Sequence, residues 1–187
     1  MTGGDVALRS RNLDSRGLEI LPERRHLPFD DHTSWKIIVR RVLEYAFLGR
    51  PACLMCYEPD RFSLAHQLAD KRTERIDGRK YLMAFTESCP RQLISSVADG
   101  DEFQLSVLWL CSVPLTETER LRNLARAVRG RKRLFDELPE TQEEVLVRVD
   151  DGEVLWWINP HRSEEDIREA LREAARSVGW KFTVKSD

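Results

Sequence analysis

The chain has 187 residues, of which 41% are hydrophobic and 33% are charged, and its formal net charge at pH 7 is −2. This length and composition allow one ordinary domain, or one small domain with an extension. The near-neutral net charge excludes a globally basic nucleic-acid binder, although a local basic patch is compatible with it. No apolar run approaches the roughly 20 residues that cross a bilayer, and the first thirty residues have no apolar signal-peptide core, so we expect a cytoplasmic protein without membrane contact.

The N-terminal third is expected to be an arm followed by a helix. Residues 1–30 combine Gly3, Gly4, two prolines and many charges without a sustained period, which predicts a flexible arm. From Thr33 to Leu48, apolar residues recur at helical spacing and form one stripe, and Gly49 before Pro51 ends the helix.

The middle of the chain predicts short antiparallel strands joined by tight turns. Asp77-Gly78 and Asp99-Gly100 are dipeptides that favour hairpins, because both central residues of such a turn need positive φ. We expect these strands to form a small, strongly bent antiparallel β-barrel or sheet, which with the preceding helix makes a unit over residues 31–115. The expected strands are Ala52–Tyr57, Thr73–Ile76, Lys80–Phe85, Gln92–Val97 and Glu102–Leu110.

The last part, residues 116–187, predicts a basic helix and a β-β-α-β unit, so the fold class is α+β. The helix covers Thr116–Val128, and a hairpin follows with strands Val145–Val149 and Val154–Ile158. Ser163 is positioned to cap the next helix and Gly179 to end it, before a final alternating strand. This unit is too small to be safely stable alone, so we expect it to dock on the body, on a protein partner, or in a homodimer.

Four arginines make the main charged feature. Their spacing of i, i+4, i+7 and i+11 aligns them on one side of a helix, where guanidinium groups can follow a phosphate backbone. The alternative is a solvated helical face neutralised by nearby acids. These residues are Arg122, Arg126, Arg129 and Arg133.

Two other features of the sequence can each be interpreted in more than one way. Cys53 and Cys56 form a C-x-x-C pair, but residues three apart on a strand point to opposite faces, which favours packed thiols over a zinc site or redox use. Adjacent Trp156 and Trp157 also point to opposite faces, so one is core and the other either packs internally or contacts a partner.

The chain contains none of the sequence patterns that mark common catalytic sites. A nucleophile elbow, a phosphate-binding loop, a dinucleotide-binding glycine motif and H-E-x-x-H are all missing from the sequence. We therefore expect a non-enzymatic protein without a cofactor or a metal ion.

Residues from about Trp35 to Gln104 resemble a WYL domain, an Sm/SH3-like β-barrel named for a Trp-Tyr-Leu tripeptide, here without a helix-turn-helix. The resemblance covers about 70 residues and rests on the helix that ends at Leu48, the strand LMCY that ends at Tyr57, Lys80-Tyr81-Leu82 at the tripeptide position, and PRQLISSV from Pro90. The phrase DGRKYLMAFTE is also similar, more weakly, to the SseB-type family of small α+β proteins.

The WYL resemblance implies a regulatory or accessory module that binds single-stranded nucleic acid or a nucleotide, in phage defence or CRISPR-linked regulation. Aromatic faces beside cations at a barrel mouth can stack a base and neutralise phosphate. The alternatives are that the two tyrosines are strand core, and that the protein is an interaction adaptor such as an immunity, chaperone-like or complex-subunit protein. The residues that the resemblance implies are Tyr57, Arg75, Lys80, Tyr81 and Arg91.

Overall fold

The computed structural model describes residues 4–12, 16–23, 29–57, 70–99, 108–112, 116–129, 144–149 and 154–185. The strands in these ranges are β1 (Asp5–Asn12), β2 (Arg16–Pro22), β3 (Ala52–Tyr57), β4 (Asp70–Ile76), β5 (Arg79–Thr86), β6 (Leu108–Cys111), β7 (Val145–Val149), β8 (Val154–Ile158) and β9 (Lys181–Lys185). The helices are α1 (Phe29–Phe47), α2 (Arg91–Asp99), α3 (Thr118–Arg129) and α5 (Glu164–Ser177).

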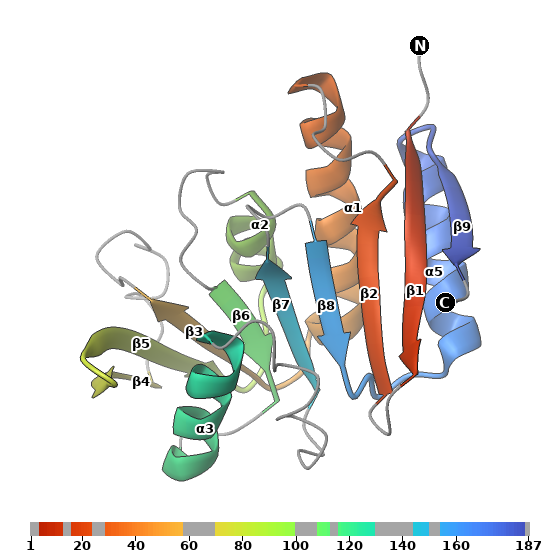
Figure 1. Ribbon diagram of the computed structural model, residues 1–187. Helices are drawn as coiled ribbons and strands as arrows, with labels where there is room; N and C mark the ends of the chain where they lie inside the picture. Colours follow the sequence, from red (N-terminus) through yellow and green to blue (C-terminus); the bar gives the residue numbers. More distant parts are fainter. Residues whose placement is uncertain are drawn as a thin grey trace.

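All of these strands belong to one sheet, and the fold is α+β as predicted. The strand order is β4-β5-β3-β6-β7-β8-β2-β1-β9, with β4 and β9 at opposite ends (Figure 1). Neighbouring strands are antiparallel except β1 and β9, which are parallel. In the part of the chain that the structure describes, no helix is both long and apolar enough to span a bilayer.

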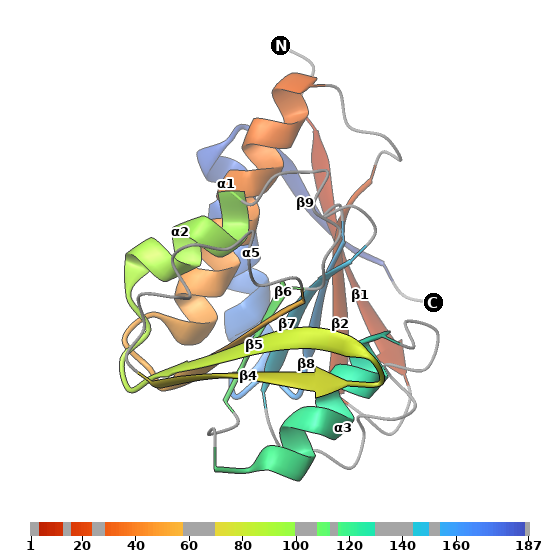
Figure 2. The same cartoon turned by 90° about the vertical axis from the view of Figure 1, so that its left-hand side faces the viewer.

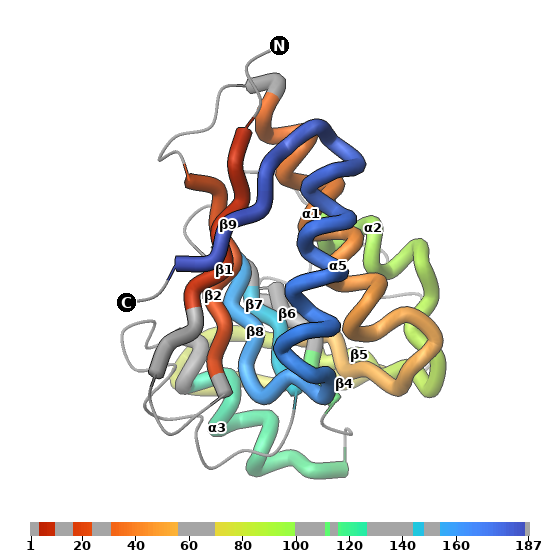
Figure 3. The backbone as a smooth tube through the Cα atoms, turned by 90° about the vertical axis from the view of Figure 1, so that its right-hand side faces the viewer, coloured from red at the N-terminus to blue at the C-terminus, as the bar shows by residue number. Residues whose placement is uncertain are grey.

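Helices cover both faces of the sheet. We call the side covered by α1, α2 and α5 the three-helix face and the side covered by α3 the α3 face (Figure 2). On the three-helix face, α1 packs beside α2 and α5, and Figure 3 shows α5 alongside α1 with β9 beside β1. Each face has its own apolar core, because alternate residues of a strand point to opposite sides.

Three local signals of the sequence are realised where they were predicted, whereas Asp99 of the second predicted hairpin turn is instead the last residue of α2, and Gly100 lies outside the described residues. Asp77 and Gly78 have φ values of 48° and 80° and form the turn between β4 and β5. The side chain of Ser163 accepts a hydrogen bond of 3.1 Å from the backbone N–H of Asp166, and Gly179 has a φ of 74° just beyond α5. These signals succeed because each acts within a few residues of chain.

The prediction of an N-terminal arm is wrong for residues 5–12 and 16–22. These residues form β1 and β2, and β2 pairs with β8 while β1 pairs with β9. Val6, Leu8 and Ile20 are each 0% exposed in the core of the three-helix face. The first two strands therefore lie inside the C-terminal unit, between its hairpin and its last strand.

Of the predicted barrel or sheet, the sheet is what forms, because the strands of the middle third are part of one open sheet whose end strands are β4 and β9. The sheet continues from β3 through β6 to β7, across the boundary that was predicted at residues 115 and 116. The segment from Gln92 to Val97 is not a strand but part of α2, whose Leu93, Ile94 and Val97 are buried at helical spacing. Residues 102–107 of the predicted strand Glu102–Leu110 lie outside the described residues, and the last three residues of that strand belong to β6.

The contact between Gly4 and Trp180 gives a direct test of how β1 and β9 dock. A Cβ atom on Gly4 would lie 2.4 Å from Cε2 of the Trp180 ring, whose side chain is buried, and the backbone N–H of Lys181 donates to the carbonyl of Gly4 at 3.1 Å. We expect Gly4→Ala to lower the free energy of unfolding by about 1–3 kcal/mol, because a rigid buried ring must shift. Urea denaturation measures this loss. The cost of Gly4→Ala should shrink in a Trp180→Leu background, and an equal cost in both backgrounds would contradict the contact.

Candidate functional site

One side of the β4–β5 hairpin carries three exposed cations. Lys71 and Arg75 of β4 are paired in register with Ala84 and Lys80 of β5, so Lys71, Arg75 and Lys80 belong to the three-helix face of the sheet. All three side chains are exposed. We call Lys71, Arg75 and Lys80 the cationic stripe.

The acidic residues of β4 belong to the opposite, α3 face. Glu74 is paired in register with Tyr81, which is buried in the core beneath α3, and Asp70 is paired with Phe85 on the same side. Glu74 lies 3.8 Å from a guanidinium nitrogen of Arg72 and is hydrogen-bonded by Arg122 of α3. The two-residue alternation of β4 thus places Asp70 and Glu74 on the α3 face and Lys71 and Arg75 on the three-helix face.

The predicted arginine face of α3 is packed against this acidic side. Arg122 also donates to Glu119 at 2.8 Å, and these two carboxylates raise the pKa of its guanidinium. The Nε atom of Arg126 lies 3.5 Å from a carboxylate oxygen of Asp77. Neutralised arginines fit the alternative of a charge-balanced helical face. The side chain of Arg129 and the whole of Arg133 lie outside the described residues.

The five residues implied by the WYL resemblance are not gathered at one opening. Tyr81 is only 2% exposed, so it is core and offers no aromatic face to a ligand. Tyr57 is paired in register with Tyr81, and its side chain lies outside the described residues. Arg75 and Lys80 are neighbours across the hairpin, whereas Arg91 belongs to α2, where it contacts Glu44 of α1 at 3.1 Å. Of these five residues, Arg75 and Lys80 lie beside each other on an exposed surface.

Lys71 is the member of the stripe that the sequence reasoning missed. The predicted strand began at Thr73, whereas β4 begins at Asp70. The signal was present, because Lys71 continues the alternation of Thr73 and Arg75 by one step towards the N-terminus.

The adjacent tryptophans are both buried, and each donates its indole N–H to a buried carboxylate. Trp156 is 9% exposed and donates to Glu19 at 3.2 Å, and Trp157 is 1% exposed and donates to Glu144 at 2.9 Å. The two residues belong to the cores on opposite faces of the sheet. Neither indole is a surface anchor, so the interpretation in which one of these tryptophans contacts a partner is not supported.

Glu144 is the centre of a second polar cluster, at the end of α1. Its side chain is 0% exposed, and a guanidinium nitrogen of Arg50 lies 3.0 Å from its Oε2 atom. The backbone N–H of His161 donates to Oε1 at 3.2 Å, and the Nδ1 atom of the same residue lies 3.7 Å from Oε2. Arg50 also donates to the carbonyl of Ala46. Because a buried carboxylate needs a paired cation, this cluster joins β7, β8 and α1 structurally.

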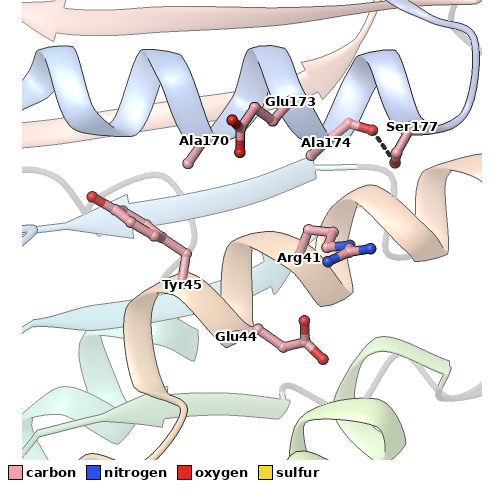
Figure 4. Close-up of a pocket in the computed structure, with 7 residues that line it drawn as sticks. All are labelled: Arg41, Glu44, Tyr45, Ala170, Glu173, Ala174 and Ser177. Atoms are coloured by element: carbon pink, nitrogen blue, oxygen red, sulfur yellow. Dashed lines mark hydrogen bonds between the residues drawn. The ribbon is translucent and has the colours of Figure 1, made fainter.

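A groove of about 430 Å³ lies between α1 and α5. Figure 4 shows Tyr45 and Arg41 of α1 on one side of it, and Glu173 and Ser177 of α5 on the other. The ring of Tyr45 packs edge-on against Trp157, with centroids 6.2 Å apart. Arg41 is outnumbered by two carboxylates among the lining residues, so this groove is a poorer anion site than the cationic stripe. Its lining residues are Arg41, Glu44, Tyr45, Ala170, Glu173, Ala174 and Ser177.

The described cysteines are packed in the interior. Cys53, Cys89 and Cys111 are free and buried, and burial raises the pKa of the Cys89 thiol to about 12. The side chain of Cys56 lies outside the described residues, so the C-x-x-C pair is described only at Cys53. Within the described ranges, no group of three or more histidine, cysteine or acidic side chains is arranged to hold a metal ion.

Comparison of the chain with protein-family models, with curated proteins and with solved structures finds no match. The resemblance to WYL domains therefore stays a prediction.

Proposed function

We propose that this protein is a non-enzymatic accessory or regulatory module that binds nucleic acid through the cationic stripe of the β4–β5 hairpin. The observation that carries the proposal is the separation of charge in β4, where acids belong to the α3 face and Lys71 and Arg75 to the other. The proposal keeps the ligand class that the WYL resemblance implies, and it moves the site from a barrel mouth to an exposed hairpin.

The spacing of the stripe suits contacts with phosphate groups. Lys71 and Arg75 are four residues apart on a strand, which corresponds to about 13 Å. Lys80 is directly opposite Arg75 in the register, so two cations are close together and the third is farther along the strand. Lysine and arginine side chains arranged in this way neutralise phosphates regardless of base sequence, and they release counterions on binding.

The direct test is fluorescence anisotropy with short labelled single-stranded DNA and RNA and with duplex DNA, at several salt concentrations. We expect salt-dependent binding to the wild-type protein. Replacing all three residues of the stripe by glutamine should weaken binding and reduce the salt slope for duplex DNA by about 2.7, because each lost phosphate contact removes about 0.9.

A matched control removes the same amount of charge from other exposed positions. Arg79 is on the same hairpin but the α3 face, and Arg176 and Lys181 are at α5 and β9. The triple variant Arg79→Gln, Arg176→Gln and Lys181→Gln should keep most of the affinity. Equal losses in both triple variants would show a general charge effect, and the absence of salt-dependent binding at tens of micromolar would refute the proposal.

A protein-interaction adaptor is the alternative, and the groove between α1 and α5 is the feature that favours it. Its lining includes Tyr45 and Arg41, and tyrosine and arginine are enriched in contact surfaces between proteins. Co-purification of one stoichiometric protein partner without nucleic-acid absorbance, combined with no change on substituting the cationic stripe, would support this function.

A further inference from the structure

Two buried cysteines that are 58 positions apart in the chain are direct neighbours across the sheet. In the antiparallel register of β3 and β6, Cys53 is paired with Cys111. Both side chains are 0% exposed, and both belong to the apolar core on the α3 face. The Sγ atom of Cys111 lies 3.7 Å from the carbonyl oxygen of Cys53. Neighbouring strands therefore present two thiols to the same small space.

This arrangement meets the distance requirement for a disulfide. Directly opposite residues of antiparallel strands have Cα atoms about 4.5 or 5.5 Å apart, depending on which kind of pair they form. Disulfides connect residues whose Cα atoms are about 4.4–6.8 Å apart, so either kind of pair falls within the range. A bond between these residues needs no movement of one strand past the other.

We propose that Cys53 and Cys111 are a disulfide-forming pair that links β3 to β6 when the chain meets a disulfide oxidant such as glutathione disulfide. One thiolate attacks the oxidant, forms a mixed disulfide and releases one glutathione thiolate. The second cysteine thiolate attacks the protein sulfur of the mixed disulfide and releases the other glutathione. Two protein thiols are oxidised to one disulfide, one glutathione disulfide is reduced to two thiols, and no other reactant is needed.

The burial of both thiols sets when the bond forms. In the folded protein neither sulfur is exposed, so we expect slow oxidation that requires local opening of the sheet. During refolding the thiols are accessible until β3 and β6 pair. The closed bond would enclose the part of the chain that contains the β4–β5 hairpin and α2, and it would be shielded from reductants afterwards.

The other cysteines are placed less well for this bond. Cys89 belongs to the core on the three-helix face, and the raised pKa of its thiol keeps it protonated at neutral pH. Cys56 is paired in register with Leu108. The proposal therefore names one connectivity out of those that four cysteines allow.

The test is to refold the full chain in a buffer of reduced and oxidised glutathione, block free thiols, and map the linked peptides by mass spectrometry without reduction. We expect one dominant species that is about 2 Da lighter than the reduced chain before the thiols are blocked and in which Cys53 is joined to Cys111. Its thermal midpoint should be about 5–10 °C above that of the reduced chain. Cys53→Ala and Cys111→Ala should each abolish this species, whereas Cys89→Ala should retain it.

The mapping on the wild-type chain needs no variant, so it decides the matter even if a substituted chain fails to fold. A mixture of linkages, a dominant linkage through Cys56 or Cys89, or no linkage under these conditions would overturn the proposal. A Cys53–Cys111 bond that lowers the thermal midpoint would also overturn it, because it would show that the native register does not accommodate the bond.

Discussion

Deletion of residues 1–22 is expected to abolish cooperative folding. These residues contain β1 and β2, which fill the sheet between β8 and β9. Burial of an aliphatic side chain contributes about 1.5–3 kcal/mol. Val6, Leu8, Leu18 and Ile20 are at most 5% exposed, so their combined loss is comparable to the roughly 5–15 kcal/mol that stabilises a typical domain. Thermal unfolding followed by near-ultraviolet circular dichroism should show no cooperative transition in the truncated chain.

The control is deletion of residues 1–3, which leaves both strands intact and should leave the transition unchanged. Addition of a synthetic peptide of residues 1–23 to the truncated chain should restore part of the transition, because β2 and β1 can then re-enter the gap beside β8. An unchanged thermal midpoint after deletion of residues 1–22 would mean that the segment is an arm after all, and would contradict the sheet order.

Replacing Arg50 by methionine is expected to lower the free energy of unfolding by about 3 kcal/mol. The reason is that the carboxylate of Glu144 is fully buried and loses the guanidinium that faces it at 3.0 Å. Glu144→Gln should cost less, since the amide keeps an oxygen for the indole N–H of Trp157. The double variant should be more stable than the sum of the two losses predicts, by 1 kcal/mol or more, because no charge is then buried alone. Urea denaturation of the four proteins measures this coupling.

A surface ion pair in the same chain provides the matched control. Arg168 and Glu164 form an i,i+4 pair on α5, with side chains that are 35% and 47% exposed. The same cycle of substitutions there should give a coupling of only about 0.3–0.5 kcal/mol, because water screens exposed charges. A coupling between Arg50 and Glu144 as small as that of the control would show that their cluster does not hold α1 to the sheet.

In the candidate site, features set by neighbouring residues could be predicted from the sequence, and contacts between distant residues could not. The turn at Asp77-Gly78 was predicted from two residues, and it fixes the register that places Arg75 opposite Lys80. The sequence does not distinguish between ligand contact and a neutralised face for Arg122, because its partner Glu74 is 48 positions away in the chain. Helix α2 could have been predicted, because Leu93, Ile94 and Val97 recur at helical spacing in the sequence. The prediction of a strand there did not use this spacing.

The sequence by itself determined the α+β class, the helices at α1, α3 and α5, the hairpin turn after β4 and the cap of α5, because each depends on residues within one or two turns of chain. Only the tertiary structure decided that β2 pairs with β8, that both tryptophans are buried, and that the sheet stays open. The physical reason is that alternation gives a strand two faces but does not specify its neighbour. That choice depends on packing between segments more than a hundred residues apart.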